Sequence, residues 1–527
     1  MGVAFAVVVP FFWLGNASGH DFEFHVLSWM EVVNQWKQGI LLPRWAQFAH
    51  WGYGEARFLF YPPASWNLGA LLGVLLPWKM APGAYIWCAL TASGCSMFLL
   101  ARRWVPRNDA LFATAFYVAN PYHLVIVYWR SAMAELLAGC LLPLLVLWTL
   151  RAEEEGVRAV VPLSLIVAAS WATNAPSAVM INYSLALLII IAAIFRRNPR
   201  LLFYGAAAVV LGGALAAFYV LPAAYEQKWV NIGEVLAPGL RPQDNFLFAR
   251  TGDADHNRFN LLISLIGVSE VVALAAAVHW SRRWRQHDKL TWYVLTAWGV
   301  AAVALMFSVT RVFWQHLPEL RFVQLPWRWL LSLNVVLAML VPLAWRRWSA
   351  RIGLGIVLFA VTATVWVRVQ PPWWDRAADI QELHDFIEDG DGYEGVDEYV
   401  PAGADPYELK KDLPQISTLK GEPVAHQTDE WKAESKHFSV EVSRPERLRL
   451  RLLNYPAWRV EVNGREVKAA TRAVTGEIVF PVEAGKSDVR VTFTRTRDRF
   501  IGVIISLAAL VAVLGMALAG RRRRAGS

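Results

Sequence analysis

Long apolar blocks divided by short arginine-rich breaks constrain this 527-residue chain more than any other feature. A membrane-spanning helix needs roughly 20 mostly apolar residues. Hydrophobic residues make up 56% of the chain and charged residues 18%, so we predict a mainly α-helical, polytopic membrane protein with about twelve spans. The predicted spans cover 3–14, 82–101, 109–128, 136–150, 159–173, 176–195, 201–222, 260–280, 290–309, 327–345, 352–369 and 500–520.

Basic clusters follow the blocks in a regular way, because two predicted spans separate each cluster from the next. Short cytoplasmic loops carry an excess of Lys and Arg, so all the clusters and both termini are predicted to be cytoplasmic. The net charge of +9 is then a matter of topology and gives no indication of nucleic-acid binding. The clusters are Arg102/Arg103/Arg107, Arg151/Arg158, Arg196/Arg197/Arg200, Arg282/Arg283/Arg285, Arg346/Arg347/Arg351 and Arg521 to Arg524. The extracytoplasmic segments are 15–81, 129–135, 223–259, 310–326 and 370–499.

Residues 64–78 form one more apolar stretch, which we interpret as re-entrant or interfacial. A span at this place would invert the side of every later arginine cluster. Residues 3–14 lack the basic flank of a secretory signal, and we interpret them as a short first span. The three cysteines lie inside apolar blocks, which excludes a disulfide framework and a cysteine-based zinc site.

Two extracytoplasmic regions are large enough to carry a function. In the first outer loop, 15–81, apolar residues recur at helical spacing from Phe24 to Trp36. They predict an amphipathic helix on the membrane surface that ends at Gly39. The second region, 370–499, begins with twelve carboxylates and one arginine between Asp375 and Glu408.

The rest of residues 370–499 changes to alternating apolar and polar residues, which predicts strands. Asn463-Gly464 is a strong hairpin signal. We therefore predict a small β-sandwich, which serves as a lid or packing domain or as a sugar-binding surface. The predicted organisation is a transmembrane domain over 1–369, the extracytoplasmic domain over 370–499, and a last helix with a basic tail over 500–527.

The sequence Gly19-His20-Asp21-Phe22-Glu23-Phe24-His25 is the strongest candidate for chemistry. If a helix begins near Asp21, then Asp21 and His25 share one face and Glu23 points elsewhere. A carboxylate at the outer interface is suited to take a proton from an attacking hydroxyl. The structural alternative is an N-cap, because aspartate often precedes a helix. His20, Asp21, Glu23 and His25 also offer ligands for a divalent metal, although their spacing matches no established signature.

Arginines gather at the predicted outer ends of the spans. Arg130 is placed to bind a phosphate at headgroup depth, because a guanidinium offers two donors to phosphate oxygens. An ion pair between Arg130 and Glu135 that caps the next helix explains the same residues equally well. Positive charge on the outer side exceeds what the topology rule predicts, which indicates an anionic ligand. The other outer arginines are Arg44, Arg57, Arg321 and Arg328.

These motifs resemble, over nearly the whole chain, a bacterial family of polytopic membrane proteins labelled as 6-pyruvoyl-tetrahydropterin synthase-related. Nothing in the chain resembles the histidine-based zinc site of the soluble pterin enzyme. The resemblance rests on Gly19 to His25, Pro43-Arg44-Trp45, Gly52-Tyr53-Gly54, Phe60-Tyr61-Pro62-Pro63, Arg130 to Glu135, Arg321 to Arg328, Glu398-Tyr399-Val400-Pro401 and Tyr455-Pro456-Ala457-Trp458.

That family is similar in layout to the C-type glycosyltransferases, which have a short first span and a long first outer loop with an essential acidic residue. The resemblance implies that Asp21 is a catalytic base, with His20 and Glu23 beside it. Asp21-x-Glu23 stands where those enzymes have an Asp-Asp or Asp-x-Asp pair, which leaves a metal requirement open. The expected substrate-binding residues are His25, Arg44, Trp45, Glu55, Arg57, Tyr61, Arg130, Glu135, Arg321, Gln324 and Arg328.

The leading hypothesis is transfer of a hexose or pentose from a polyprenyl-phosphate-linked donor to a glycan, lipid or protein acceptor, with inversion. Transfer would occur on the extracytoplasmic face of a bacterial inner or plasma membrane. Nucleotide sugars are not expected there, so the donor needs a lipid-phosphate leaving group.

Two alternatives remain open. One is a non-catalytic scaffold or sugar-binding protein in envelope polysaccharide assembly, with the β domain as its working part. The other is a lipid or solute transporter, which the intramembrane Glu270 would serve. The sequence contains no phosphate-binding glycine loop, G-x-S-x-G motif or HExxH motif, which excludes ATP-driven and zinc-protease functions.

Overall fold

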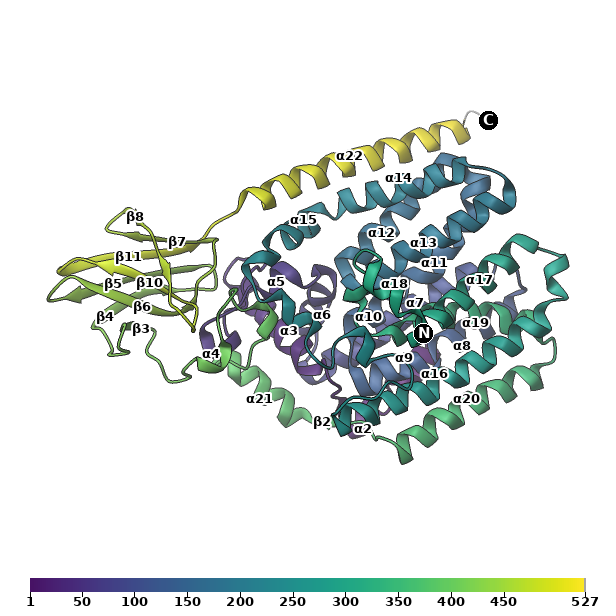
Figure 1. The fold of residues 1–527 in the computed structure, drawn as a ribbon, viewed down its shortest axis with the longest axis horizontal. Helices are drawn as coiled ribbons and strands as arrows, with labels where there is room; N and C mark the ends of the chain where they lie inside the picture. Colours follow the sequence, from purple (N-terminus) through teal and green to yellow (C-terminus); the bar gives the residue numbers. More distant parts are fainter. Residues whose placement is uncertain (526–527) are drawn as a thin grey trace.

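The computed structural model describes residues 1–525, with side-chain environments up to residue 519. Apolar helices fill most of the molecule, and a group of strands lies at one end (Figure 1). Eight segments of the described chain are helical, long and apolar enough to cross a membrane. They are Trp78–Ala101, Arg107–Arg130, Met133–Thr173, Ala175–Arg196 (α13), Ala254–Ser281 (α16), Pro326–Ala344, Trp348–Arg368 (α20) and Arg497–Ala519 within α22 (Arg497–Ala525).

Two further pairs of apolar helices are sharply bent. The helix α14 (Arg200–Leu215) meets the segment Ala217–Trp229 at 77°. The helix α17 (Lys289–Leu305) meets the segment Ser308–His316 at 91°. If each pair is one span, the described part of the chain has up to ten candidate spans.

The predicted set of twelve spans differs from these candidates at two places. Gly2–Leu14 is apolar but shorter than a full span. Met133–Thr173 is a single helical run of 41 residues, which the sequence divided into two spans. In this run α12 (Val160–Thr173) packs back against α10 (Met133–Ala138) and α11 (Leu141–Glu155). Gly156 lies between α11 and α12 with a φ of 59°, a backbone conformation that favours glycine.

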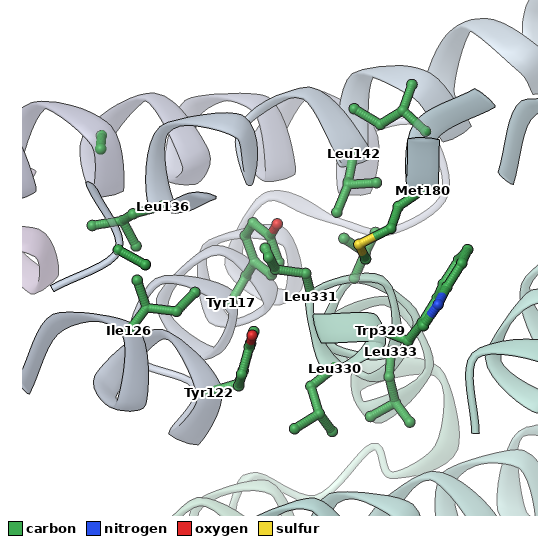
Figure 2. Packing of buried hydrophobic residues seen from close by; sticks show 14 of the residues in the cluster. Tyr117, Tyr122, Ile126, Leu136, Leu142, Met180, Trp329, Leu330, Leu331 and Leu333 are labelled. Carbon is green, nitrogen blue, oxygen red and sulfur yellow. The ribbon is translucent and has the colours of Figure 1, made fainter. Parts of the chain in front are cut away.

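The centre of the bundle is mainly apolar. Every residue from Leu330 to Pro342 of α19 (Leu330–Ala344) is buried, as expected for a helix that is apolar on all sides. Figure 2 shows side chains of α19 packed among residues of the helices that surround it. The centre is not wholly apolar, because α19 also carries the buried residues Ser332 and Asn334. The neighbours of α19 in Figure 2 include Tyr117, Tyr122, Ile126, Leu136, Leu142 and Met180.

The helix predicted between Phe24 and Trp36 is α3 (Phe22–Lys37), which ends before Gly39 as expected. The apolar stretch at 64–78 forms α6 (Pro63–Leu75), which is not among the candidate spans. The side of α3 is covered by α6 and by α21 (Ala377–Glu388). The helix α3 is therefore an internal helix, because it packs on more than one face, and its prediction as a helix on the membrane surface was wrong.

The C-terminal strands form two antiparallel sheets with the orders β3-β6-β10-β9 and β4-β5-β11-β7-β8. Leu448 and Phe480 from one sheet share a hydrophobic core with Phe438 and Val489 from the other, so the region is a β-sandwich. The hairpin predicted at Asn463-Gly464 joins β7 and β8, with φ of 52° and 74° at the two residues. The strands are β3 (Ile416–Thr418), β4 (His426–Trp431), β5 (Ser435–Val442), β6 (Glu446–Leu453), β7 (Trp458–Val462), β8 (Arg465–Val467), β9 (Ala470–Thr471), β10 (Glu477–Val482) and β11 (Gly485–Phe493).

The acidic segment before the sandwich packs against the loop at residues 15–81. Its strand β2 (Trp374–Asp375) pairs with β1 (Asn16–Ala17), and α21 packs on α3. The Tyr393 hydroxyl donates a hydrogen bond to Glu31 of α3. Helices α3 and α21, from two segments 340 or more residues apart in sequence, thus lie together between the bundle and the sandwich (Figure 1).

The sandwich is held against this layer by charged and aromatic contacts. Arg44 makes two hydrogen bonds, of 3.1 and 2.6 Å, to Glu434. The Trp45 ring lies within 6 Å of the rings of Tyr455, Trp458 and Phe493. Arg44 and Trp45 were predicted to bind substrate, but both are used to attach the sandwich.

Lys436 makes the sandwich a pH-dependent part of the fold. It is buried near the rings of Trp431 and Trp458, and burial lowers its pKa to about 7. Because an unfolded lysine has a pKa near 10.4, the folded chain binds fewer protons between about pH 7 and about pH 10. Stability should therefore rise with pH in this window, by a total on the order of 4 kcal/mol. Denaturant unfolding at pH 7 and about pH 9.5 should show this rise in wild type and not in Lys436→Met. An equal change in the free energy of unfolding between the two pH values in both proteins would contradict the prediction.

Candidate functional site

Asp21 occupies the residue before α3, but its side chain does not cap the helix. The carboxylate makes no hydrogen bond to the first backbone amides of α3, and its side chain is 40% exposed. The N-cap explanation for this aspartate therefore does not hold. A carboxylate that is partly exposed and free of a capping role is available for chemistry.

The backbone around Asp21 is fixed to the turn that follows Arg130. The Asp21 amide donates to the Arg130 carbonyl at 2.9 Å, and the Gly19 amide donates to the Ser131 hydroxyl at 2.8 Å. Ser131 has a φ of 51° and directly follows a π-helical turn, Ile126–Arg130 (η2). Such turns occur often at functional sites because they redirect side chains.

Gly19 is required at this contact. A Cβ atom at Gly19 would clash with the Trp129 carbonyl group and the Arg130 backbone. We expect Gly19→Ala to lower the free energy of unfolding by about 1–3 kcal/mol and to displace Asp21, as overpacking usually does. Gly233→Ala is the matched control, because nothing lies within 4 Å of the added methyl group there. Thermal unfolding in detergent measures both variants, and equal melting temperatures would contradict the prediction.

Arg130 connects Asp21 to a buried ionic network. Its Nη2 lies 3.6 Å from the Asp21 Oδ2, and its Nη1 donates to the Glu135 Oε2. Arg328 Nε donates to the same Glu135 oxygen at 3.0 Å, and the Tyr122 hydroxyl donates to the other oxygen. Two arginines thus share one buried carboxylate, and the excess positive charge is adjacent to Asp21.

Glu135 holds the arginines in place and is not exposed to a substrate. Its side chain is 2% exposed, and both oxygens accept hydrogen bonds. The ion pair between Arg130 and Glu135 that the sequence left as an alternative is present. Arg328 also donates to the Gln324 side chain, whose amide donates to the Val235 carbonyl. Gln324 therefore supports Arg328 from the segment that precedes it.

The two histidines of the motif differ in exposure, because His25 is buried and His20 is exposed. Burial lowers the pKa of His25 to about 4, although Asp21 acts in the opposite direction. Partial desolvation also lowers the pKa of His20, whose ring centre lies 4.8 Å from that of Phe259. His25 packs between Trp29 and Tyr61. The Tyr61 ring also lies 4.8 Å from that of Phe24, so the motif packs against Tyr61 of the following loop.

Glu23 faces away from Asp21, as its spacing on the helix predicted. It lines a separate cavity with residues of the acidic segment. Burial and the carboxylates of Asp375, Glu382 and Glu394 raise the pKa of Glu23. Glu23 is therefore not a second carboxylate beside Asp21, and the motif does not gather its four candidate ligands around one point.

The described residues contain one group whose ligand atoms converge closely enough for a metal ion. It consists of Asp429, His437 and Asp488 on the outer face of the sandwich. No residue of the first outer loop belongs to it.

Three predicted substrate residues lie away from Asp21 or are used elsewhere. Arg57 is buried and donates to Glu55 and to the Ser28 hydroxyl. Glu55 also accepts a hydrogen bond from the Val396 amide of the acidic segment. Arg321 is exposed and lies over the Phe322 ring. Of the five arginines expected to bind an anionic substrate, Arg130 and Arg328 share the Glu135 carboxylate, and Arg130 also lies beside Asp21.

Sequence reasoning missed Tyr122, Ser131 and Trp327. The Tyr122 hydroxyl bonds Glu135, the Ser131 hydroxyl bonds the Asp21 loop, and the Trp327 ring lies 5.0 Å from the Arg130 guanidinium. Each residue type is common at a span end, so the sequence carried no signal for these contacts.

Neither a comparison with protein-family models nor a comparison with curated proteins finds a match for this chain.

Proposed function

We propose that the chain is a membrane glycosyltransferase that uses a polyprenyl-phosphate-linked sugar as donor. The observation that carries this proposal is the exposed, non-capping Asp21 carboxylate held 3.6 Å from the buried Arg130 guanidinium. A base and a cationic group fixed next to each other are the two elements that glycosyl transfer from a phosphate donor requires.

In this proposal, Asp21 takes the proton of an acceptor hydroxyl. The acceptor oxygen forms a bond to the anomeric carbon while the bond from that carbon to the donor phosphate oxygen breaks, which inverts the anomeric centre. The electron pair stays with the lipid phosphate, whose added negative charge Arg130 and Arg328 stabilise. The proton passes from Asp21 to solvent, because the side chain is partly exposed.

The proposal includes a membrane orientation. Two spans in Met133–Thr173, one span in each bent pair, and Gly2–Leu14 as a short first span would bring the total to twelve. All arginine clusters would then be cytoplasmic, together with both termini. Asp21, the acidic segment and the sandwich would lie on the extracytoplasmic side, where lipid-linked sugars serve as donors.

The donor class is tested with the purified chain in proteoliposomes. We expect label to move to an acceptor from radiolabelled polyprenyl-phosphate hexoses or pentoses, and not from nucleotide sugars added on either side of the membrane. Transfer from nucleotide sugars would overturn the proposed donor. A wild-type preparation that is folded but transfers label from neither class would overturn the proposed function.

Transport is the second candidate, because one intramembrane carboxylate is not fully paired. Glu270 accepts a hydrogen bond from Asn334 at 2.8 Å, and its other oxygen has no partner among the described residues. Partly satisfied carboxylates inside a helical bundle often mark ion pathways. If the chain is a transporter, Glu270→Gln should abolish activity and Asp21→Asn should not.

A further inference from the structure

A cavity with a mixed polar and apolar lining lies on the opposite side of α3 from Asp21. It has a volume of about 760 Å³ and is bounded by α3, the loop at 48–52, the acidic segment and the sandwich. Successive helical residues are 100° apart, so Glu23 projects roughly 200° around α3 from Asp21. The meeting point of α3, α4 (Ala49–Gly52), α21 and the sandwich can be followed in Figure 1. The cavity is therefore distinct from the Asp21 site.

The cavity is lined by four carboxylates that lack partners. Within the described part of the chain, the side chains of Glu23, Asp391, Glu394 and Asp412 are exposed and make no hydrogen bond or ion pair with another residue. Other carboxylates of this layer are paired, for example Glu31 with the Phe48 amide. The ligand atoms of these four carboxylates do not converge as they would for one metal ion. An extended ligand with several hydrogen-bond donors suits this spread better than a single cation does.

The Trp51 ring lines the same cavity and lies next to the Lys411 ammonium group. The Lys411 Nζ lies 4.2 Å from the centre of the Trp51 ring. Trp51 has a φ of 55° and follows His50, whose φ is 50°, so two successive residues adopt the left-handed conformation. Hydrogen bonds of 3.0 Å from the Trp51 amide to the Tyr393 carbonyl, and from the Tyr393 amide to the Phe48 carbonyl, hold this turn. The backbone position of Trp51 is thereby fixed before any ligand binds.

We propose that this cavity binds an amino-bearing saccharide segment of the acceptor or product glycan. A sugar ring stacks its C–H face on an indole, and an ammonium group is attracted to an aromatic face and to carboxylates. Two cations, Lys411 and Arg451, stand against four carboxylates in the lining, so the cavity carries an excess of negative charge. The nature of the ligand as a glycan rests on the proposed glycosyl transfer, but the binding itself does not require Asp21.

Binding is tested by titration calorimetry on the full-length chain in detergent. The probes are a glucosamine tetramer and the N-acetylglucosamine tetramer of the same linkage, which differ only in the charged amines. We expect the glucosamine tetramer to bind at least about ten-fold more tightly. The double variant Asp391→Asn/Glu394→Gln, which changes two exposed side chains, and Trp51→Ala should each weaken this binding about ten-fold or more.

Trp13→Ala is the matched control, because Trp13 is an exposed tryptophan on α2 (Phe11–Leu14), outside the cavity. Equal binding of both tetramers, binding of neither, or unchanged binding in the variants would overturn the proposal. Tetralysine tests whether charge alone explains binding. If it binds as tightly as the glucosamine tetramer, and Trp51→Ala does not weaken its binding, the cavity recognises positive charge and not a saccharide, which would also overturn the proposal. Asp21→Asn should bind the tetramer like wild type, so failure of the catalytic proposal and failure of this one are separable.

Discussion

Replacing Asp21 by asparagine is expected to lower the rate of glycosyl transfer about a thousand-fold while leaving the chain folded. A positioned general base typically contributes between about 10² and about 10⁴ in rate. The Asp21 side chain caps no helix and is 40% exposed, so an asparagine side chain in its place should not change the melting temperature. Initial rates with a lipid-linked donor, together with thermal unfolding of the same preparation, measure both effects.

Asp21→Glu serves as the partner variant, because it keeps the carboxylate and moves it by one methylene. It should retain more transfer than Asp21→Asn and bind the donor equally well. A wild-type rate in Asp21→Asn would remove Asp21 from the mechanism. A melting temperature that falls together with the rate would show that the side chain has a structural role instead.

Replacing Glu135 by glutamine is expected to destabilise the fold by roughly 3–5 kcal/mol, because it leaves Arg130 and Arg328 buried without their shared anion. Transfer should be lost as well, since Arg130 would no longer be held beside Asp21. Unfolding in detergent measured against increasing denaturant gives the stability change.

Glu434→Gln is the control for Glu135→Gln, because it removes the partner of one arginine in a more exposed pair. The Arg44 side chain is 24% exposed, so the expected loss is about 1 kcal/mol or less. If Glu434→Gln costs as much stability as Glu135→Gln, the buried network is not the element that organises the site.

The helical bundle and the sandwich could be predicted because their signals are local. Apolar blocks of span length predict helices wherever they fold, and strand alternation with Asn463-Gly464 predicts a hairpin. The extent of α3 followed in the same way from apolar spacing and Gly39. The burial of α3 could not be predicted, because the helix α21 that covers it begins 340 residues after α3 ends. An amphipathic helix has the same pattern whether lipid or protein covers its apolar face.

The site was predictable only in part, for a related reason. Residue types identified Asp21, Arg130, Glu135 and Arg328, and tertiary packing brings them together. The same residue-type argument also selected Arg57, which burial commits to Glu55. A buried arginine must be paired, and the sequence does not say whether its partner is a ligand or a glutamate.

A structure of the full chain determined with bound polyprenyl phosphate would locate the donor site. We predict the phosphate within about 3 Å of a guanidinium nitrogen of Arg130 or Arg328, with the Asp21 carboxylate facing it. A phosphate bound away from both arginines, for example at the apolar groove between α14 and α22, would contradict the proposed site.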